Sequence, residues 1–140
     1  MNARGIKLIK DFEGCRLTAY KCPAGVWTIG YGHTGGVHSG MKITTDQAEK
    51  LLRQDLVKFE TAVIAYNYVY HFNENEIAAL TSFAYNCGTG SLKNLLKNGS
   101  RSRSEIRSAI LLYNKDINGK YLAGLARRRK AELQLFNTPV

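Results

Sequence analysis

The sequence predicts an α+β fold in which one helix is followed by a small antiparallel sheet and then by a larger group of helices. Two observations predict it. Between residues 16 and 29, apolar and polar residues alternate on both sides of a turn-forming segment, a pattern typical of a β-hairpin. From residue 44 onward, apolar residues recur at three- and four-residue spacing, which is typical of amphipathic helices.

The composition is that of one globular domain, which we expect to span residues 1–140. Twenty basic against 11 acidic residues give a net charge of +9, so we expect a polyanionic or acid-bearing partner. Nucleic acid, an anionic membrane and the bacterial cell wall all fit this charge. The three cysteines lack the spacing of a zinc site, so we expect reduced thiols and neither a metal nor a cofactor.

The amino-terminal third is expected to form a helix followed by a hairpin. Asn2 is a suitable N-cap for the helix and Gly14 a suitable stop. In the turn of the hairpin, Pro23 takes the second position and Gly25 the fourth, as β-turns favour. The expected elements are a helix at residues 3–13, strands at 16–21 and 26–29 around a turn at 22–25, and a short third strand near 37–41.

The rest of the chain is expected to be helical. Two helices begin with a capping box, in which an N-cap side chain and a Glu or Gln three residues later bond each other's backbone N–H groups. These boxes pair Thr44 with Gln47 and Asn73 with Glu76. The expected elements are a long helix from 44 to about 65, an aromatic connector at 66–72, helices opening at 73, near 92 and at 102, a turn at 118–119 and a last helix at 125–136.

Three polar residues around the hairpin could together carry the hydrolysis of a glycosidic bond. That reaction needs a protonated acid beside the leaving oxygen and a second group that handles water or the anomeric carbon. Glu13 ends the first helix, Cys22 opens the turn and Thr28 lies in the second strand. Taken singly, each has a simpler explanation: a solvated carboxylate, a small turn residue and a β-branched strand residue.

In combination, the motifs resemble the phage-type lysozymes, the endolysin muramidases of glycoside hydrolase family twenty-four. The resemblance covers nearly the whole chain and rests on FEGCRLTAY, VWTIGYGHT, ITTDQAEKLLRQDL, FAYNCGTGSL and GLARRRKAE. It implies a lysozyme-like fold, with a small antiparallel sheet lobe and a larger helical lobe joined by a long helix. It also implies hydrolysis of the β-1,4 bond between N-acetylmuramic acid and N-acetylglucosamine in bacterial peptidoglycan, which lyses the host cell.

The resemblance also implies roles for single residues. Glu13 would donate the proton, and Thr28 and Cys22 would hold and activate the attacking water, giving inversion. Cys22 departs from the family, in which Asp is more usual, and a free thiol has a pKa of about 8.5. Cys22 could therefore be a water-activating base, a covalent nucleophile or a degraded remnant. The other implied positions are Thr34, Tyr85, Asn86 and Arg127 for substrate binding, and His33 with Asp55 as a structural ion pair.

The resemblance and the local patterns lead to two expectations about exposure. Cys22 is expected to be accessible, whereas Cys15 and Cys87 lie in apolar helix-end patterns and are expected to be more buried. Of the basic residues 127–130, one is expected to face the substrate and the others to be solvated, because neighbours on a helix point in different directions.

Other functions remain open at this point. A catalytically impaired wall-binding module would explain Cys22, but the intact Glu13 and Thr28 count against it. Nucleic-acid binding would explain the charge, but no helix-turn-helix or zinc-finger pattern appears, so we expect no nucleic-acid partner. A third possibility is non-hydrolytic cleavage of the same bond, which leaves a 1,6-anhydro product.

The apolar segments are short. None forms the apolar core of a signal peptide, and none reaches the length of a membrane span. We therefore expect no stable membrane insertion. We also expect the protein to be a monomer. It would remain in the host cytoplasm until a holin gives it access to the cell wall.

Overall fold

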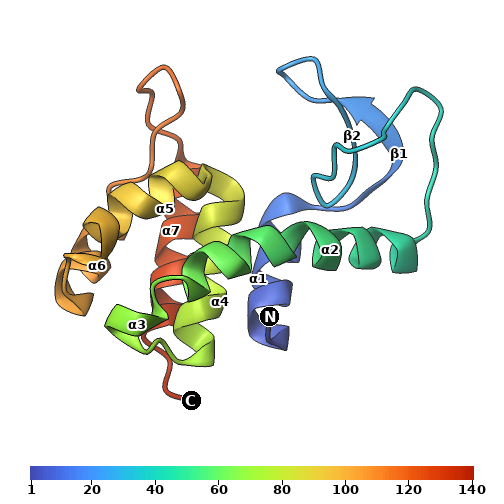
Figure 1. Cartoon of the computed structure of the whole chain (residues 1–140). Coiled ribbons are helices and arrows are strands. Elements are labelled where there is room, and N and C mark those ends of the chain that lie inside the picture. The colour runs from blue at the N-terminus through green and yellow to red at the C-terminus, as the bar shows by residue number, and fades with distance from the viewer. The chain divides into compact units, whose positions relative to one another are not determined.

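The computed structural model describes all 140 residues and has the expected α+β class, with helices and one two-stranded antiparallel sheet (Figure 1). The chain divides into two compact units. Residues 1–8 and 58–140 form what we call the helical unit, and residues 9–57 form the hairpin unit. Helices α1 (Ala3–Glu13) and α2 (Thr45–Ile64) each contribute residues to both units. A single catalytic domain over the whole chain stays a prediction.

The hairpin unit contains strands β1 (Arg16–Lys21) and β2 (Trp27–Gly30), which pair antiparallel. β1 has the predicted bounds, and β2 is shifted by one residue towards the carboxyl terminus. The turn between them is closed by two backbone hydrogen bonds. The N–H of Gly25 donates to the carbonyl of Cys22 at 2.8 Å, and the N–H of Cys22 donates to the carbonyl of Val26 at 3.0 Å. The predicted β-turn is confirmed.

The third strand expected near residues 37–41 is wrong. The chain instead makes one isolated bridge at the end of this segment, between Thr18 of β1 and Lys42. Gly36 and Gly40 have φ angles of 70° and 82°. These are left-handed conformations that extended strands do not adopt, so the glycines that suit this segment to a loop prevent a continuous strand.

The two predicted capping boxes are confirmed. Thr44 and Gln47 exchange hydrogen bonds of 2.8 and 3.1 Å between side chain and backbone N–H before α2. Asn73 and Glu76 do the same before α4 (Glu74–Cys87). The remaining elements are α3 (Asn67–Tyr70), α5 (Thr89–Leu96), the 3₁₀ turn η1 (Lys97–Gly99), α6 (Arg103–Ile110) and α7 (Ala123–Phe136). No helix of the chain combines the length and the apolar character needed to cross a bilayer.

The core of the helical unit is formed by the apolar faces of α4, α5, α6 and α7 (Figure 1). Its buried side chains include Leu80 and Phe83 of α4, Leu92, Leu95 and Leu96 of α5, Ile106 and Ile110 of α6, and Leu135 and Phe136 of α7. Helix α3 lies within the segment expected to be an aromatic connector. There Tyr70 stacks on Phe72 with ring centroids 4.7 Å apart, so the aromatic run both forms a helical turn and covers the core.

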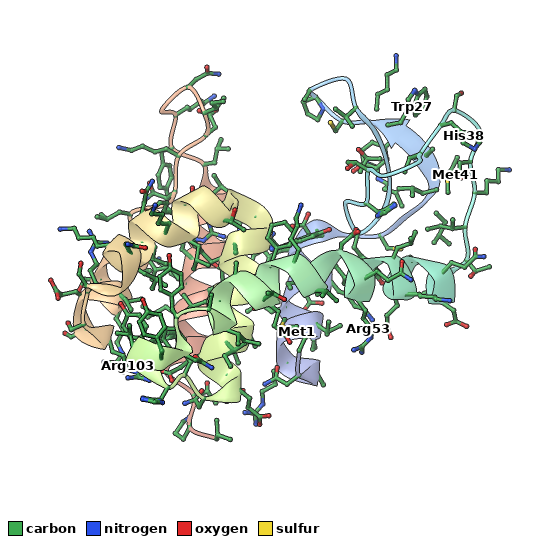
Figure 2. All side chains as sticks on the ribbon, viewed as in Figure 1. Met1, Trp27, His38, Met41, Arg53 and Arg103 are labelled. Atoms are coloured by element: carbon green, nitrogen blue, oxygen red, sulfur yellow. The ribbon has the colours of Figure 1, made fainter.

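Arg103, at the start of α6, joins three helices of the helical unit (Figure 2). Its Nε lies 2.7 Å from Oε2 of Glu76 in α4, and its Nη2 donates to the carbonyl of Tyr70 in α3 at 2.6 Å. The guanidinium also lies over the ring of Phe72. Because Arg presents several N–H donors in a fixed plane, this one side chain can bond the backbone carbonyl at the end of α3 and the carboxylate near the start of α4 at the same time.

Positive charge is unevenly distributed between the two units. Fourteen of the 20 basic and six of the 11 acidic residues belong to the helical unit, which leaves a net charge of +8 there. The hairpin unit has a net charge of +1 by the same count. The anionic partner expected from the composition is therefore attracted mainly to the helical unit.

Gly5 of α1 should resist replacement by alanine. A Cβ at residue 5 would lie 2.7 Å from the Cβ of Ala78 in α4, whereas the position of Gly90 in α5 has open space around it. Gly→Ala in an open helix stabilises by about 0.5–1 kcal/mol, which we expect for Gly90→Ala. Gly5→Ala should instead lower the free energy of unfolding by roughly 1–3 kcal/mol through overpacking. Urea denaturation measures both, and equal stabilisation at the two sites would contradict the close packing.

Candidate functional site

The Cys22 thiol lies in the turn of the hairpin, among several hydrogen-bond donors. Backbone hydrogen bonds from Val26 and Ala24, together with one from the Thr28 side chain, lower the pKa of Cys22 below its ordinary value, and slight desolvation opposes them. These groups stabilise the thiolate, which is the form of cysteine that accepts a proton or attacks carbon. The turn therefore increases the fraction of Cys22 that is present as the thiolate at a given pH.

The Thr28 hydroxyl connects the turn to strand β2. The residue is buried, with 4% of its surface exposed, and its Oγ1 donates to the carbonyl of Val26 at 3.0 Å. A hydroxyl has one proton, so it donates either to this carbonyl or to the sulfur of Cys22 at any time.

Glu13 is the last residue of α1 and is partly buried. The helix ends there because Gly14 takes a φ of 69°, and the Gly14 N–H donates to the carbonyl of Lys10 at 3.0 Å. Glu13, Cys22 and Thr28 all belong to the hairpin unit.

The structure brings His33 and Asp55 together within the hairpin unit. Nδ1 of His33 lies 2.8 Å from Oδ2 of Asp55, and Nε2 lies 2.7 Å from the carbonyl of Gly35. Both neighbours accept hydrogen bonds, so the ring satisfies both when each nitrogen carries a proton. With 16% and 27% of the two side chains exposed, the pair is partly buried, and it joins the loop after β2 to α2.

The four predicted substrate-binding residues are distributed over both units. Thr34 is exposed in the hairpin unit. Tyr85 and Asn86 are consecutive residues near the end of α4, and Arg127 is exposed on α7, all in the helical unit. The Tyr85 ring meets the ring of Phe59 edge-on, with centroids 5.4 Å apart, so it takes part in packing as well as lining the surface.

The three cysteines are free thiols in different surroundings. Cys15 is exposed, and the expectation that it is more buried than Cys22 is wrong. It lies between the end of α1 and strand β1, whose first three residues are exposed. Cys87 is partly buried, and desolvation raises the pKa of its thiol, an effect that the nearby Arg129 guanidinium opposes.

Sequence reasoning missed a buried ionic cluster between α7 and α4. The prediction that Arg128 and Arg129 are solvated is wrong: they are 4% and 0% exposed. Nε of Arg129 lies 2.7 Å from Oε1 of Glu132, and Nε of Arg128 lies 3.3 Å from Oε2. The hydroxyl of Ser82 donates to Oε2 of Glu132 at 2.6 Å. Burial raises the pKa of the Glu132 carboxyl, and the two guanidiniums counteract this. The spacing of three and four residues along α7 was the available signal.

Arg129 also contacts the end of α4. Its Nη2 donates to Oδ1 of Asn86 at 2.8 Å, and its Nη1 donates to Sγ of Cys87 at 2.6 Å. Asn86 and Cys87 in turn line a cavity of about 660 Å³, together with residues of α5, of the loop after α6 and of α7. No group of three or more His, Cys, Asp or Glu side chains gathers at a spacing that could hold a metal ion.

Comparisons with known proteins agree with one another. The sequence profile of the phage lysozyme family matches residues 10–132. An endolysin of Acyrthosiphon pisum secondary endosymbiont phage 1 is 37% identical over 146 residues, which cover 99% of this chain and 98% of that protein. An endolysin of Lactococcus phage c2 is 42% identical over 144 residues, covering 100% of this chain but 61% of that protein. The solved muramidase domain of SpmX from Asticaccaulis excentricus matches with a TM-score of 0.89 and 36% identity, over 99% of this chain and 97% of that one.

Cys22 should react with alkylating reagents at lower pH than Cys87. The thiolate reacts, and hydrogen bonds lower the pKa of Cys22 below its ordinary value whereas burial raises that of Cys87. A lowered pKa leaves thiolate present as the pH falls. Mass spectrometry after short iodoacetamide pulses at increasing pH should therefore show labelling of Cys22 before Cys87, with Cys22→Ser identifying the Cys22 peptide. The same pH dependence at both residues would contradict the effect of the turn.

Proposed function

Because this chain belongs to the phage lysozyme family, we propose that Glu13, Cys22 and Thr28 are the residues with which it hydrolyses peptidoglycan. The chain is an endolysin-type muramidase, a glycoside hydrolase of the bacterial cell wall that lyses the host. Its target is the β-1,4 bond between N-acetylmuramic acid and N-acetylglucosamine. The observation that carries the site assignment is that the three residues all belong to the hairpin unit, with Cys22 in the hydrogen-bonded turn and Thr28 buried in β2.

Glu13 acts as the general acid. Its carboxylic acid gives a proton to the glycosidic oxygen while the bond from this oxygen to the anomeric carbon breaks, so the departing sugar leaves as a neutral alcohol. The position of Glu13 at the end of α1, immediately before the hairpin that carries Cys22 and Thr28, supports this role.

Cys22 acts as the general base. A water molecule attacks the anomeric carbon from the face opposite the leaving oxygen, and the Cys22 thiolate takes its proton and becomes a thiol. The Thr28 hydroxyl orients the water, a role supported by its buried position in β2 next to the turn that carries Cys22. The attack forms the new carbon–oxygen bond on the opposite face, so the configuration inverts. Proton exchange with solvent then returns Glu13 to its acid form and Cys22 to its thiolate.

The proposal also covers the oligomeric state of the protein and the way in which it reaches the cell wall. The chain acts as a monomer, and a holin releases it from the host cytoplasm. The positive charge of the helical unit supports an anionic partner, and the family favours the cell wall over nucleic acid as that partner. Light scattering of the purified chain, and lysis of producing cells with and without a co-expressed holin, check these two statements.

Substitutions at Glu13 and Cys22 should separate the acid from the base. Glu13→Gln keeps the shape but removes the proton donor, so clearing of purified cell walls should slow by about 10²–10⁴-fold. Cys22→Ala removes the base and should slow clearing by a similar factor, whereas Cys22→Asp supplies a carboxylate and should remain active. Cys15→Ala, an exposed cysteine of the same unit, is the matched control and should clear walls at the wild-type rate.

Two results would overturn these assignments. If Glu13→Gln retains half of the activity or more, Glu13 is not the acid. If Cys22→Ala clears walls as well as the wild type, the thiol is a remnant and Glu13 works with Thr28 alone.

The stereochemistry of the product should show inversion. Proton NMR during the first minutes of digestion should show the new reducing end as the α-anomer, because water attacks the β-bond from the opposite face. An initial β-anomer would instead indicate Cys22 as a covalent nucleophile. A product without a reducing end, lighter by one water in mass spectrometry, would indicate the non-hydrolytic reaction.

A further inference from the structure

The loop between α6 and α7 ends in a β-turn whose shape does not depend on Ile117. The N–H of Gly119 donates to the carbonyl of Asp116 at 2.9 Å, and Gly119 has a φ of 79°. Oδ1 of Asp116 accepts from the backbone N–H groups of Asn118 and Lys120, both at 2.9 Å. Asp at the first position and Gly at the fourth are residues that such turns favour. Ile117 takes the second position, where the turn needs no apolar side chain.

Backbone hydrogen bonds hold this turn at the end of a projecting loop. Lys115 and Tyr121 form an antiparallel bridge, and the N–H of Leu122 donates to the carbonyl of Asn114 at 2.9 Å. The two sides of the loop are therefore joined below the turn. In Figure 1 the loop, drawn in orange, extends away from the helices of the helical unit. Ile117 lies at the tip of a loop with a defined shape.

Ile117 is 100% exposed, so nothing in the chain shields it from water. It borders the cavity beside Asn86 and Cys87, but a side chain with its whole surface accessible is not enclosed there. Single exposed apolar residues are common on proteins. Here the loop and the residues beside it expose five apolar side chains: Leu111, Leu112, Ile117, Tyr121 and Leu122. Taking such surface out of water is favourable, and for Ile117 only a partner outside the chain can do so.

The charges of the loop indicate an anionic partner. Lys115 and Lys120 are exposed, whereas Asp116, the only acidic residue of the loop, is partly buried and bonds the backbone through Oδ1. The surrounding sequence is also basic, because residues 91–140 contain 11 of the 14 basic and three of the six acidic residues of the helical unit. A partner that fits both the tip and its surroundings combines negative charge with an apolar interior.

We propose that residues 114–122 bind the surface of an anionic lipid bilayer, with Ile117 entering the hydrocarbon and Lys115 and Lys120 lying at the level of the lipid phosphates. Tyr121 suits the boundary between the two layers, because its ring is apolar and its hydroxyl is polar. A wall polymer would attract the two lysines but offers no hydrocarbon for Ile117. The contact is reversible and involves one leaflet, so it agrees with the absence of a helix able to cross a bilayer. It follows from the loop and its charges and does not depend on the proposed function.

The test compares Ile117→Asn with Val140→Asn. Each removes an exposed branched apolar side chain of the helical unit, and Val140, which is 75% exposed, lies at the end of that unit away from the loop (Figure 1). The probes are vesicles of phosphatidylglycerol and phosphatidylcholine in equal parts, with binding measured by co-sedimentation. Ile117→Asn should weaken binding by about tenfold or more, and Val140→Asn should bind as the wild type does. Circular dichroism should show that both variants are folded, because neither side chain is buried.

The two lysines should account for a preference for anionic lipid. A lysine near an anionic leaflet contributes about fivefold to binding. Replacing Lys115 and Lys120 together by glutamine should therefore weaken binding to the mixed vesicles by about tenfold or more. Binding to vesicles of phosphatidylcholine alone should be weaker for the wild type and unchanged by the two replacements. Equal loss on both kinds of vesicle would overturn the role of the lysines.

Tryptophan fluorescence measures how deeply the tip enters the bilayer. Trp27 is the only tryptophan of the chain, so Trp27→Phe combined with Ile117→Trp places the single indole at the tip. Mixed vesicles should shift its emission to shorter wavelength, and lipids brominated on the acyl chains should quench it. Retained binding with the emission found in water would indicate adsorption by charge alone and would overturn the insertion of the tip.

Three results would overturn the proposal as a whole: no vesicle binding by the wild type, wild-type binding by Ile117→Asn, or equal weakening by Ile117→Asn and Val140→Asn. Ile117→Asn should also clear lipid-free cell walls at the wild-type rate. Slower clearing with vesicle binding retained would assign the tip to the wall instead. Glu13→Gln should bind vesicles as the wild type does, so a failure of the wild type to clear walls overturns only the proposed function.

Discussion

The burial of Glu132 between two guanidiniums is the interaction on which the helical unit depends most. A charge taken out of water costs several kcal/mol unless it is paired and hydrogen-bonded, and removing one member of such a pair costs about 3–5 kcal/mol. Here α7 supplies Arg128, Arg129 and Glu132, and α4 supplies the Ser82 hydroxyl. The ion pairs form within α7, whereas the hydrogen bond from Ser82 to Glu132 and that from Arg129 to Asn86 join the cluster to α4 and hold the end of α4 against α7.

Cys22 and Cys87 show how the same side chain acquires opposite properties. Around Cys22, backbone N–H groups and a hydroxyl stabilise negative charge at a turn, so its pKa falls. Around Cys87, loss of water dominates over the adjacent guanidinium, and its pKa rises. Cys22 is therefore suited to moving a proton. Cys87 remains a neutral thiol, whose sulfur and proton complete the contacts of Arg129 and Asn86.

Features determined by neighbouring residues were predictable from local sequence patterns. Features determined by distant partners were not, and the contact between His33 and Asp55 was expected only because the family resemblance implied it. The capping boxes at Thr44 and Asn73 and the bounds of β1 follow from local hydrogen bonding and alternation, and all are present. The third strand near residues 37–41 failed because Gly36 and Gly40 take left-handed conformations, which the residue types permit but do not determine. At the candidate site, the roles that the family motifs assign to Cys22 and Asn86 stay predictions. The motifs could not reveal that Arg129 is buried, since that depends on α4 lying against α7.

Because the two units carry different net charges, the unit that attracts an anionic polymer differs from the unit that contains the candidate catalytic residues. The charge of +8 lies on the helical unit, while the candidate acid and base lie in a unit that is nearly neutral. Long-range attraction to an anionic polymer fades over a screening length of about 8 Å at physiological ionic strength. Salt concentration therefore governs the rate at which the helical unit encounters such a polymer. Hydrogen bonds around Cys22 act over a much shorter range than this attraction, so ionic strength acts first on how often the helical unit meets such a polymer.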